Sequence, residues 1–360
     1  MIICLLSNAE SIHTKRWIDY LAGNGYEVHL ISYRSGETGG ASFYCYSPSH
    51  NNHFYKYFHF LRSFRAIKKE IWDINPDILH AHYLTSYGLL GALVGYKPLI
   101  VSAWGSDLLV DSKKSFFHKY LIRRTLERAD LVTVMASHMI PRLIELGCKR
   151  EKILKVTLGI DVEKFNIEGR KGANGKVIIL SNRVFEREQN IECIVNSLPF
   201  VVERQYNLEI RFYGDGSHRH QCENLVKTSG IENNTKFFGL VDHSQMPYHL
   251  KQADIYVSAS TSDGDHVSLM EAMACGLFPV VSDIPANREW IEDGRNGFLV
   301  PLGDPAIFAE KIIEAVEKKG LRQKAIKHNS QLVKSRAEYG CDLRLLEEHY
   351  QRLSGKKISH

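Results

Sequence analysis

The stretch that decides the fold runs from Ala253 to Pro301 and reads ADIYVSASTSDGDHVSLMEAMACGLFPVVSDIPANREWIEDGRNGFLVP. A short apolar strand, Asp254–Ser258, leads into a polar loop, and the loop is followed by a short helix that carries Glu271. Asp263 lies eight positions before Glu271, just ahead of the helix. Ligands of open α/β sheets bind at the carboxyl ends of strands, and a helix N-terminus there attracts phosphate. The stretch therefore predicts a ligand site with two carboxylates and several exposed backbone N–H groups.

A purely local role for Glu271 stays open. Ser268 is followed three residues later by Glu271, which fits a capping box at the start of the helix. In that case the carboxylate would satisfy a backbone N–H group and would not meet a ligand.

Short apolar or β-branched runs alternate with helical segments along the whole chain, which predicts parallel sheets covered by helices on both faces. In the first half the expected strands are Ile2–Ser7, Glu27–Ser32, Asp77–Ala81, Leu99–Ala103, Leu131–Ala136 and Ile153–Thr157. In the second half they are Lys176–Ser181, Leu208–Tyr213, Thr235–Phe238, Asp254–Ser258, Pro279–Ser282 and Gly297–Val300. Two such series predict an α/β protein with two doubly wound domains, joined through the polar segment 166–175.

The composition excludes several classes of protein. The chain has 360 residues, enough for two domains, and its net charge of +5 is concentrated in residues 1–165, with 21 Lys and Arg against 15 Asp and Glu. Seven scattered cysteines without a CxxC pair indicate reduced thiols rather than disulfides or a metal site. The fingerprint GxGxxG and a Walker A loop are both missing, so oxidoreductase and P-loop functions have no support.

Targeting signals are also missing from the sequence. The opening MIICLLS lacks the basic flank of a signal peptide, and the longest apolar stretch, Gly88–Ala103, is interrupted by Lys97 and Pro98. We therefore expect a soluble cytoplasmic protein.

Four motifs occur along the chain, one inside the opening stretch and three before it. The block Glu271–Gly276 reads EAMACG, the turn Tyr213–Gly216 reads YGDG, the strand end Phe238–Val241 reads FGLV, and Gly159-Ile160-Asp161 is followed by Phe165. In these motifs the chain resembles the bacterial family 4 (group 1) glycosyltransferases of the GT-B superfamily, and the resemblance covers nearly the whole chain.

The resemblance implies a GT-B fold, in which two Rossmann-like domains face a cleft. Residues 1–165 would form the acceptor-binding domain and residues 176–338 the nucleotide-sugar-binding domain, with 166–175 as the linker. The helical segment 339–360 would return toward the first domain.

The same resemblance implies the donor site. Glu271 would bind the ribose, and Arg183 would bind the diphosphate, where a fixed cation stabilises the leaving group. The loop before the helix would direct backbone amides and the helix dipole at the sugar and diphosphate. The remaining expected donor-binding residues are Asp263, Gly264, Asp265, His266, Val267, Ser268, Gly214 and Val241.

The sequence departs from the family pattern at three positions. The lysine that usually follows Arg183 is missing, and Arg187 is the cation available in its place. The first acid of the usual glutamate pair is Asp263, which is one methylene shorter. Where the family often has HGxD, this chain has Trp104-Gly105-Ser106-Asp107.

The expected catalytic residues are Asp263, Arg183, Asp107 and His13. Trp104, His80 and His82 are the candidates on the acceptor side, because they follow strands of the first domain. For Trp104 a packing role is equally open, and a histidine near a strand end is often structural.

Two basic segments suggest a surface partner. Residues 50–72 combine five Lys and Arg with aromatic side chains, and the expected helix 113–128 adds six basic residues. Nucleic acid is disfavoured, because no nucleic-acid-binding module is recognisable. An anionic membrane surface fits better, and an ordinary packed helix with a solvated basic face stays open.

The resemblance implies an enzyme that moves a sugar from a nucleotide diphosphate sugar to a glycan or lipid-linked acceptor, with retention of configuration, in cell-surface polysaccharide synthesis. No metal and no cofactor are expected. We expect the protein to lie in the cytoplasm, and the basic segments further suggest a peripheral position at the inner face of the cell membrane. The alternatives are a GT-B epimerase or phosphorylase, and a non-catalytic partner subunit of a glycosyltransferase.

Overall fold

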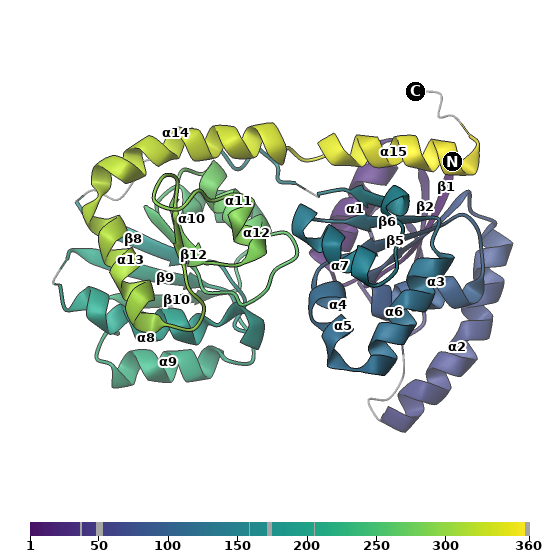
Figure 1. Ribbon diagram of the computed structural model, residues 1–360, viewed down its shortest axis with the longest axis horizontal. Helices are drawn as coiled ribbons and strands as arrows, with labels where there is room; N and C mark the ends of the chain where they lie inside the picture. Colours follow the sequence, from purple (N-terminus) through teal and green to yellow (C-terminus); the bar gives the residue numbers. More distant parts are fainter. Residues whose placement is uncertain (37, 48–52, 158, 171–174, 205, 357–360) are drawn as a thin grey trace. The chain divides into compact units, whose positions relative to one another are not determined.

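The computed structural model describes residues 1–36, 38–47, 53–157, 159–170, 175–204 and 206–356. It divides into two compact units, Met1–Leu158 with Gly340–His360, and Gly159–Tyr339 (Figure 1). Each unit contains a parallel sheet with helices on both faces, so the expected pair of doubly wound α/β sheets is confirmed.

The first unit has a seven-stranded sheet in the order β3-β2-β1-β4-β5-β6-β7. Its strands are β1 Ile2–Leu6, β2 Glu27–Ser32, β3 Ser42–Cys45, β4 Ile78–His82, β5 Leu99–Ala103, β6 Leu131–Val134 and β7 Ile153–Lys155. Its helices are α1 Ile12–Gly23, α2 His53–Ile74, α3 Gly88–Val94, α4 Ser106–Leu109, α5 Asp111–Lys114, α6 Phe116–Arg128, α7 Ile140–Glu145 and α15 Cys341–Ser354. The strand order reverses between β1 and β4, and their carboxyl ends form the edge where ligands of such sheets bind.

The second unit has a six-stranded sheet in the order β10-β9-β8-β11-β12-β13. Its strands are β8 Val177–Ser181, β9 Leu208–Tyr213, β10 Thr235–Gly239, β11 Ile255–Ser258, β12 Phe278–Ser282 and β13 Phe298–Val300. Its helices are α8 Ile191–Val202, α9 Arg219–Thr228, α10 Met246–Leu250, α11 Val267–Ala274, α12 Pro285–Arg288, α13 Pro305–Glu317 and α14 Lys319–Arg336. Two separate apolar clusters fill its core, and the strand order reverses between β8 and β11.

All twelve expected strands are present, and one further strand was missed. Strand β3 lies at the edge of the first sheet, and its SFYC side chains are exposed or half-buried, so it lacks the apolar run of a covered strand. The expected helix 113–128 is divided at Ser115, because the Ser115 side chain accepts a hydrogen bond from the His118 N–H and starts α6 there.

The first boundary also lies earlier in the structure than residue 165. Residues 159–165 belong to the second unit, where Ile160 pairs with Glu338 and Phe165 is buried in the core. Of the expected linker, residues 171–174 lie outside the described residues.

Helix α15 is anchored in the first unit, although it is far from the rest of that unit in sequence (Figure 1). Tyr350 is completely buried, and its hydroxyl lies 2.6 Å from Nδ1 of His80 on β4. The other ring nitrogen of His80 lies 2.7 Å from Oγ of Ser102. At the start of the helix, Asp342 accepts a hydrogen bond from the backbone N–H of Thr157. The last helix therefore completes the polar interior of the first sheet.

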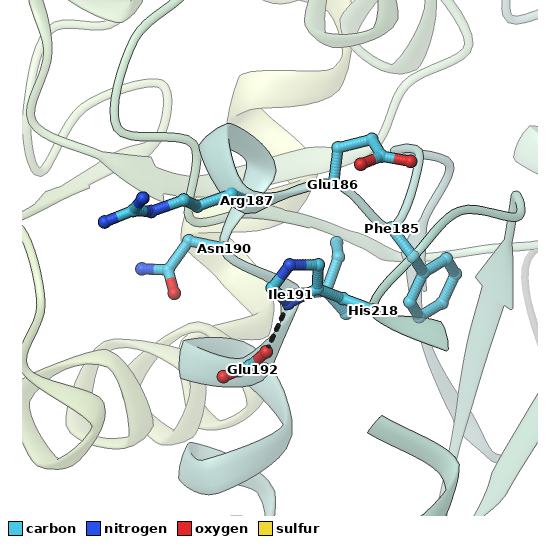
Figure 2. A pocket seen from close by; sticks show the side chains of 7 residues that line it. All are labelled: Phe185, Glu186, Arg187, Asn190, Ile191, Glu192 and His218. Carbon is cyan, nitrogen blue, oxygen red and sulfur yellow. Dashed lines mark hydrogen bonds and ion pairs between the residues drawn. The ribbon is translucent and has the colours of Figure 1, made fainter. Parts of the chain in front are cut away.

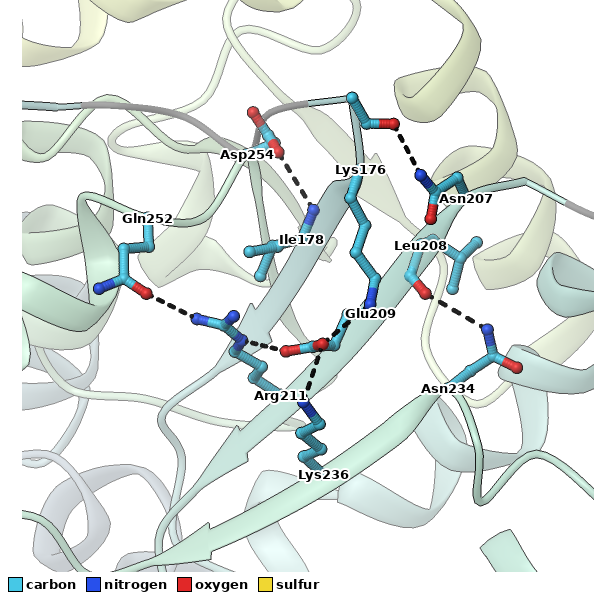
Figure 3. A network of polar contacts seen from close by, with 11 residues as sticks. Lys176, Ile178, Asn207, Leu208, Glu209, Arg211, Asn234, Lys236, Gln252 and Asp254 are labelled. Carbon is cyan, nitrogen blue, oxygen red and sulfur yellow. Dashed lines mark hydrogen bonds and ion pairs between the residues drawn. The ribbon is translucent and has the colours of Figure 1, made fainter.

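A charged network joins β9 and β10 of the second sheet to Lys176, which directly precedes β8 (Figure 3). Glu209 on β9 accepts hydrogen bonds from Arg211, Lys176 and Lys236 at 2.7, 2.9 and 3.0 Å. Burial by itself would raise the pKa of Glu209, but the hydrogen bonds from Lys176, Arg211 and Lys236 outweigh it and lower the pKa to about 2. The network therefore stabilises the second sheet as long as Glu209 is ionised.

We expect Glu209→Gln to lower the free energy of unfolding of the second unit by about 1–3 kcal/mol at neutral pH, because three cations lose their common carboxylate. The folded-state pKa lies below the ordinary value of 4.5, so this stabilisation is present above pH 4.5 and is lost as the pH falls toward about 2. Hydrogen exchange of β8–β10 at several pH values measures it, with Glu310→Gln on the exposed face of α13 as the control. A parent–variant difference that does not shrink with falling pH would contradict the network's role.

We expect Tyr350→Phe to destabilise the first unit by about 1–3 kcal/mol, because Nδ1 of His80 stays buried without a partner. Differential scanning calorimetry should show the transition of the first unit lowered by roughly 2–10 °C, with that of the second unit unchanged. Tyr248→Phe serves as the control, since Tyr248 is 67% exposed. Equal transition temperatures in Tyr350→Phe and the parent would show that the buried hydrogen bond contributes little.

Candidate functional site

The expected donor-binding residues lie in loops that follow four strands of the second sheet. Arg183 follows β8, Gly214 follows β9, Val241 follows β10 and Asp263 follows β11. Since parallel strands end at one edge, these loops share the carboxyl edge of the sheet, with the reversal of strand order between β8 and β11.

Arg183 and Asp263 form a largely buried ion pair at this edge. Nη2 of Arg183 lies 2.6 Å from Oδ2 of Asp263, and the two side chains are 12% and 14% exposed. Nε of Arg183 is buried and has no hydrogen-bond partner within the described residues. The guanidinium therefore uses only part of its five N–H donors on Asp263.

The GDG turn holds the loop that carries Arg183. Gly214 has a φ of +136°, and a Cβ atom there would lie 2.5 Å from the carbonyl oxygen of Arg183. Gly216 has a φ of +153°, and its Cβ would lie 2.6 Å from the carbonyl oxygen of Phe185. Any larger residue would push the Arg183 loop away, so both glycines are required for this close backbone packing.

His266 holds the loop before α11 from the inside. Its Nδ1 lies 2.5 Å from Oδ1 of Asn287, whose amide nitrogen donates to the Ser282 carbonyl. Nδ1 of His266 therefore carries the hydrogen, and Nε2 accepts a long contact of 3.4 Å from the Tyr256 hydroxyl. Burial, followed by the positive charge of Arg183, lowers the pKa of His266 to about 4. A neutral histidine thus supports the loop from Asp263 to Val267.

Within the same loop Gly264 is buried, while Asp265, Val267 and Ser268 are half-buried. The backbone N–H of Val267 donates to the carbonyl of Asp265, which turns the chain into the helix.

Glu271 does not act in a capping box, so that interpretation is wrong. Helix α11 begins at Val267, its N-cap is His266, and no side chain caps it. Ser268 is already inside the first turn. The Glu271 carboxylate is instead paired with His243, whose Nε2 lies 2.7 Å from Oε1.

Figure 2 shows Arg187 among the residues that line a small pocket. Its side chain is exposed in the short turn Arg187–Gln189, and no ion pair to it occurs within the described part of the chain. It lines a pocket of about 200 Å³ together with Phe185, Glu186, Asn190, Ile191, Glu192 and His218. That volume is below the roughly 300–1,000 Å³ of typical ligand sites, and neither Arg183 nor Glu271 lines it.

The candidates of the first unit gather at the carboxyl ends of β1, β4 and β5. The His82 and Trp104 rings are 4.7 Å apart, His13 and Trp104 are 5.3 Å apart, and His80 and His82 are 5.0 Å apart. His82 is hydrogen-bonded through Nδ1 to Ser7 at 2.8 Å. Burial lowers the pKa of His80 to about 3 and that of His82 well below its usual value. Both histidines are therefore neutral in the folded protein.

The Asp107 carboxyl group accepts hydrogen bonds from nearby backbone N–H groups. Oδ1 accepts hydrogen bonds from the N–H groups of Trp104 and Gly105, and Oδ2 accepts one from Leu84. Burial raises the pKa of Asp107, while these backbone hydrogen bonds lower it, and burial is the larger effect. The carboxyl group therefore organises the turn after β5.

His243, Tyr256 and Asn287 were missed by the sequence analysis. Their partners come from other loops and helices, so no local spacing marks them, although His243 lies only two residues after the expected Val241. In the described ranges no helix is long and apolar enough to cross a membrane, and no group of three or more Asp, Glu, His or Cys side chains is arranged to hold a metal ion.

Two protein-family models match most of the chain. The family model "Glycosyl transferase 4-like" matches residues 2–136, and the model "Glycosyl transferases group 1" matches residues 163–332. The amylovoran biosynthesis glycosyltransferase AmsK of Erwinia amylovora is 25% identical over 240 residues, which cover 63% of this chain and 59% of that protein. The phosphatidyl-myo-inositol mannosyltransferase of Mycobacterium tuberculosis is 24% identical, over 73% of this chain and 70% of that protein. The match to AmsK thus spans about three fifths of its length.

Solved structures share the fold over nearly the whole chain. A glycosyltransferase from Rickettsia africae has a TM-score of 0.81 at 17% identity, and 99% of each chain is covered. Anabaena HepE in complex with UDP and glucose has a TM-score of 0.78 at 14% identity, with 98% of this chain and 100% of that chain covered. The fold is therefore GT-B. Because the two family models together match most of the sequence, the chain belongs to the group 1 (family 4) glycosyltransferases.

Proposed function

We propose that this glycosyltransferase moves a sugar from a nucleoside diphosphate sugar to a glycan or lipid-linked acceptor of cell-surface polysaccharide synthesis. The observation that carries the donor part is the placement of Arg183, Asp263 and Glu271 around one sheet edge. The acceptor class is supported by two relatives, an amylovoran biosynthesis glycosyltransferase and a phosphatidyl-myo-inositol mannosyltransferase.

The donor would bind entirely to the second unit. Glu271 would accept hydrogen bonds from the ribose hydroxyl groups, and Arg183 would use the donors that Asp263 leaves over to bind the diphosphate. The backbone N–H groups of the loop Asp263–Val267 and the N-terminus of α11 would add positive potential. Asp263 would contact the sugar hydroxyl groups as well as hold Arg183.

The reaction would retain the anomeric configuration by front-side attack. The bond between the anomeric carbon and the diphosphate oxygen breaks, and its electron pair goes to the diphosphate. The acceptor hydroxyl forms the new bond on the same face and passes its proton to the departing oxygen. Negative charge thus grows on the diphosphate, where Arg183 stabilises it.

The first unit would bind the acceptor without supplying a charged group from β4. His80 and His82 are buried and neutral, and Asp107 is committed to backbone N–H groups. His13 and Trp104 are half-buried at the same edge and are therefore the residues of this group that an acceptor would contact.

We expect Glu271→Ala to weaken the binding of UDP or GDP about 10- to 150-fold, equivalent to about 1.5–3 kcal/mol for a hydrogen bond to a charged group. A thermal-shift screen of nucleoside diphosphates and their sugars selects the ligand, and isothermal titration calorimetry then compares the parent, Glu271→Ala and Glu310→Ala, a variant of an exposed glutamate on α13. Unchanged affinity in Glu271→Ala would remove the ribose role. Donor binding by the parent with no transfer to any acceptor would identify a non-catalytic partner subunit.

The surface of α5 and α6 suggests where a lipid-linked acceptor is met. Phe116, Phe117 and Tyr120 are 84%, 63% and 47% exposed. The same two helices carry the cations Lys113, Lys114, Lys119, Arg123, Arg124 and Arg128. We infer reversible attachment of this surface to the anionic inner face of a membrane, since exposed aromatic rings insert at the interface and cations bind the headgroups. Of the second basic segment, residues 50–52 lie outside the described residues, whereas Arg65, Lys68, Lys69 and Trp72 are exposed on α2.

We expect the protein to sediment with vesicles that contain anionic lipid and to be released as the salt rises from 0.1 to 1 M, because the screening length falls from about 10 to about 3 Å. Replacing Lys113 and Lys114 by Gln should weaken binding, since each cation near such a surface contributes about 1 kcal/mol. The matched control replaces the exposed Lys324 and Lys327 of α14 in the second unit. Equal binding to neutral vesicles, or none to anionic ones, would argue for a soluble acceptor.

A further inference from the structure

His243 is paired with Glu271, the residue that is expected to bind the ribose. Its Nε2 lies 2.7 Å from Oε1 of Glu271, and the two side chains are 51% and 4% exposed. The histidine belongs to the short turn His243–Gln245, which the Asp242 carboxylate caps by accepting a hydrogen bond from the Ser244 N–H at 2.7 Å. An ordered turn therefore presents a half-exposed imidazole to an almost fully buried carboxylate.

The direction of this hydrogen bond follows from the chemistry of the two groups. A carboxylate can only accept, so Nε2 of His243 carries the hydrogen and donates it to Oε1. Within the described residues no donor is paired with Oε2 of Glu271. One carboxylate oxygen is thus committed to the protein, and the other is left for a ligand.

The surroundings of His243 restrict the imidazole further. Its ring lies 5.3 Å from that of Phe165, which is buried in the core of the second unit. Val241, two residues earlier, packs against the same core cluster. These contacts hold the histidine in place, so that its hydrogen bond can fix the rotamer of Glu271.

The turn that contains His243 follows β10, so it begins at the carboxyl edge of the sheet, where ligands are expected to bind. Strand β10 is the edge strand, and the chain must pass β9 and β8 before it enters β11, which lies next to β8. The connection that contains His243 and α10 makes this crossing. The ion pair of His243 with Glu271 places the start of this connection beside α11, which follows the loop that carries Asp263.

We propose that His243 is a positioning residue for nucleoside recognition: it holds Oε1 of Glu271 so that Oε2 is directed at the ribose hydroxyl groups of a nucleoside diphosphate. The inference rests on the proposed donor site. Loss of the histidine would leave the buried carboxylate without its partner, and the carboxylate would no longer be held in the orientation that the ribose needs. The effect should depend on the ribose hydroxyl groups and on no other part of the ligand.

The test compares two ligands and four proteins by isothermal titration calorimetry. The ligands are UDP or GDP, whichever the parent binds, and its 2′,3′-dideoxy counterpart. The proteins are the parent, His243→Ala, His243→Gln and the control His220→Ala, which changes an exposed histidine on α9. A glutamine keeps an N–H donor that can reach the carboxylate. Thermal unfolding confirms that each variant is folded.

We expect His243→Ala to bind the ribonucleotide about 10- to 100-fold more weakly, as for the loss of a charge-assisted hydrogen bond, while the dideoxy ligand binds as it does to the parent. His243→Gln should recover part of the loss, and His220→Ala should match the parent. In transfer assays the loss should appear in KM for the donor, with kcat nearly unchanged.

Equal loss for both ligands would show that His243 merely stabilises the loop, and unchanged affinity would show that Glu271 needs no positioning. Either result overturns the inference while leaving the donor site intact. If the parent binds no nucleoside diphosphate in the thermal-shift screen, the proposed donor site fails first, and the inference fails with it.

Discussion

The buried contact between Arg183 and Asp263 is the interaction on which the second unit's ligand edge depends. Both side chains are nearly nine-tenths covered, and a buried charge that loses its partner costs about 3–5 kcal/mol. The pair therefore holds together the loops after β8 and β11, two strands that are adjacent in the sheet although the paired residues are 80 positions apart in the sequence. The glycines of the GDG turn and the neutral His266 then hold these loops from two further sides.

In the first unit the buried polar side chains of β4 are held by uncharged hydrogen-bond partners. His80 and His82 are completely buried, but their neighbours are hydroxyl groups and aromatic rings rather than carboxylates. Since burial disfavours the charged form of an imidazole and no acid compensates, these rings stay neutral. Tyr350 enters the network from the far end of the chain, so the end of the sequence and the first sheet are interdependent. The pairs Arg183–Asp263 and His243–Glu271 thus give the second unit a charged loop edge, whereas the buried histidines of β4 give the first sheet a polar but uncharged interior.

The sequence predicted the sheets well, because a covered parallel strand must be apolar on both faces and this leaves a readable run of residues. It failed for β3, whose side chains are partly exposed, and for residues 159–165, whose partners Glu338 and Ala337 come from the far end of the second unit. The spacing of a capping box is present at Ser268 and Glu271, but the N-cap of the helix is His266, two residues earlier, so the local alternative for Glu271 is wrong. The pairs of Arg183 with Asp263 and of Glu271 with His243 join loops that follow different strands, and no spacing within one segment reveals them.

The ion pair with Arg183 explains why an aspartate, shorter than glutamate, is suitable at position 263. An aspartate has one methylene fewer than the glutamate that the family usually has, and its carboxylate therefore stays close to the backbone of its own loop. At 2.6 Å from Arg183 it already has a strong partner, and Arg183 still has N–H donors left, since Nε makes no hydrogen bond in the described part of the chain. A guanidinium can bind a carboxylate on one side and a phosphate on another, because its donors diverge in a fixed plane. The ion pair thus fixes the orientation of the guanidinium and leaves some of its N–H donors available. Binding of an anion then costs less conformational entropy, because this long side chain is already ordered.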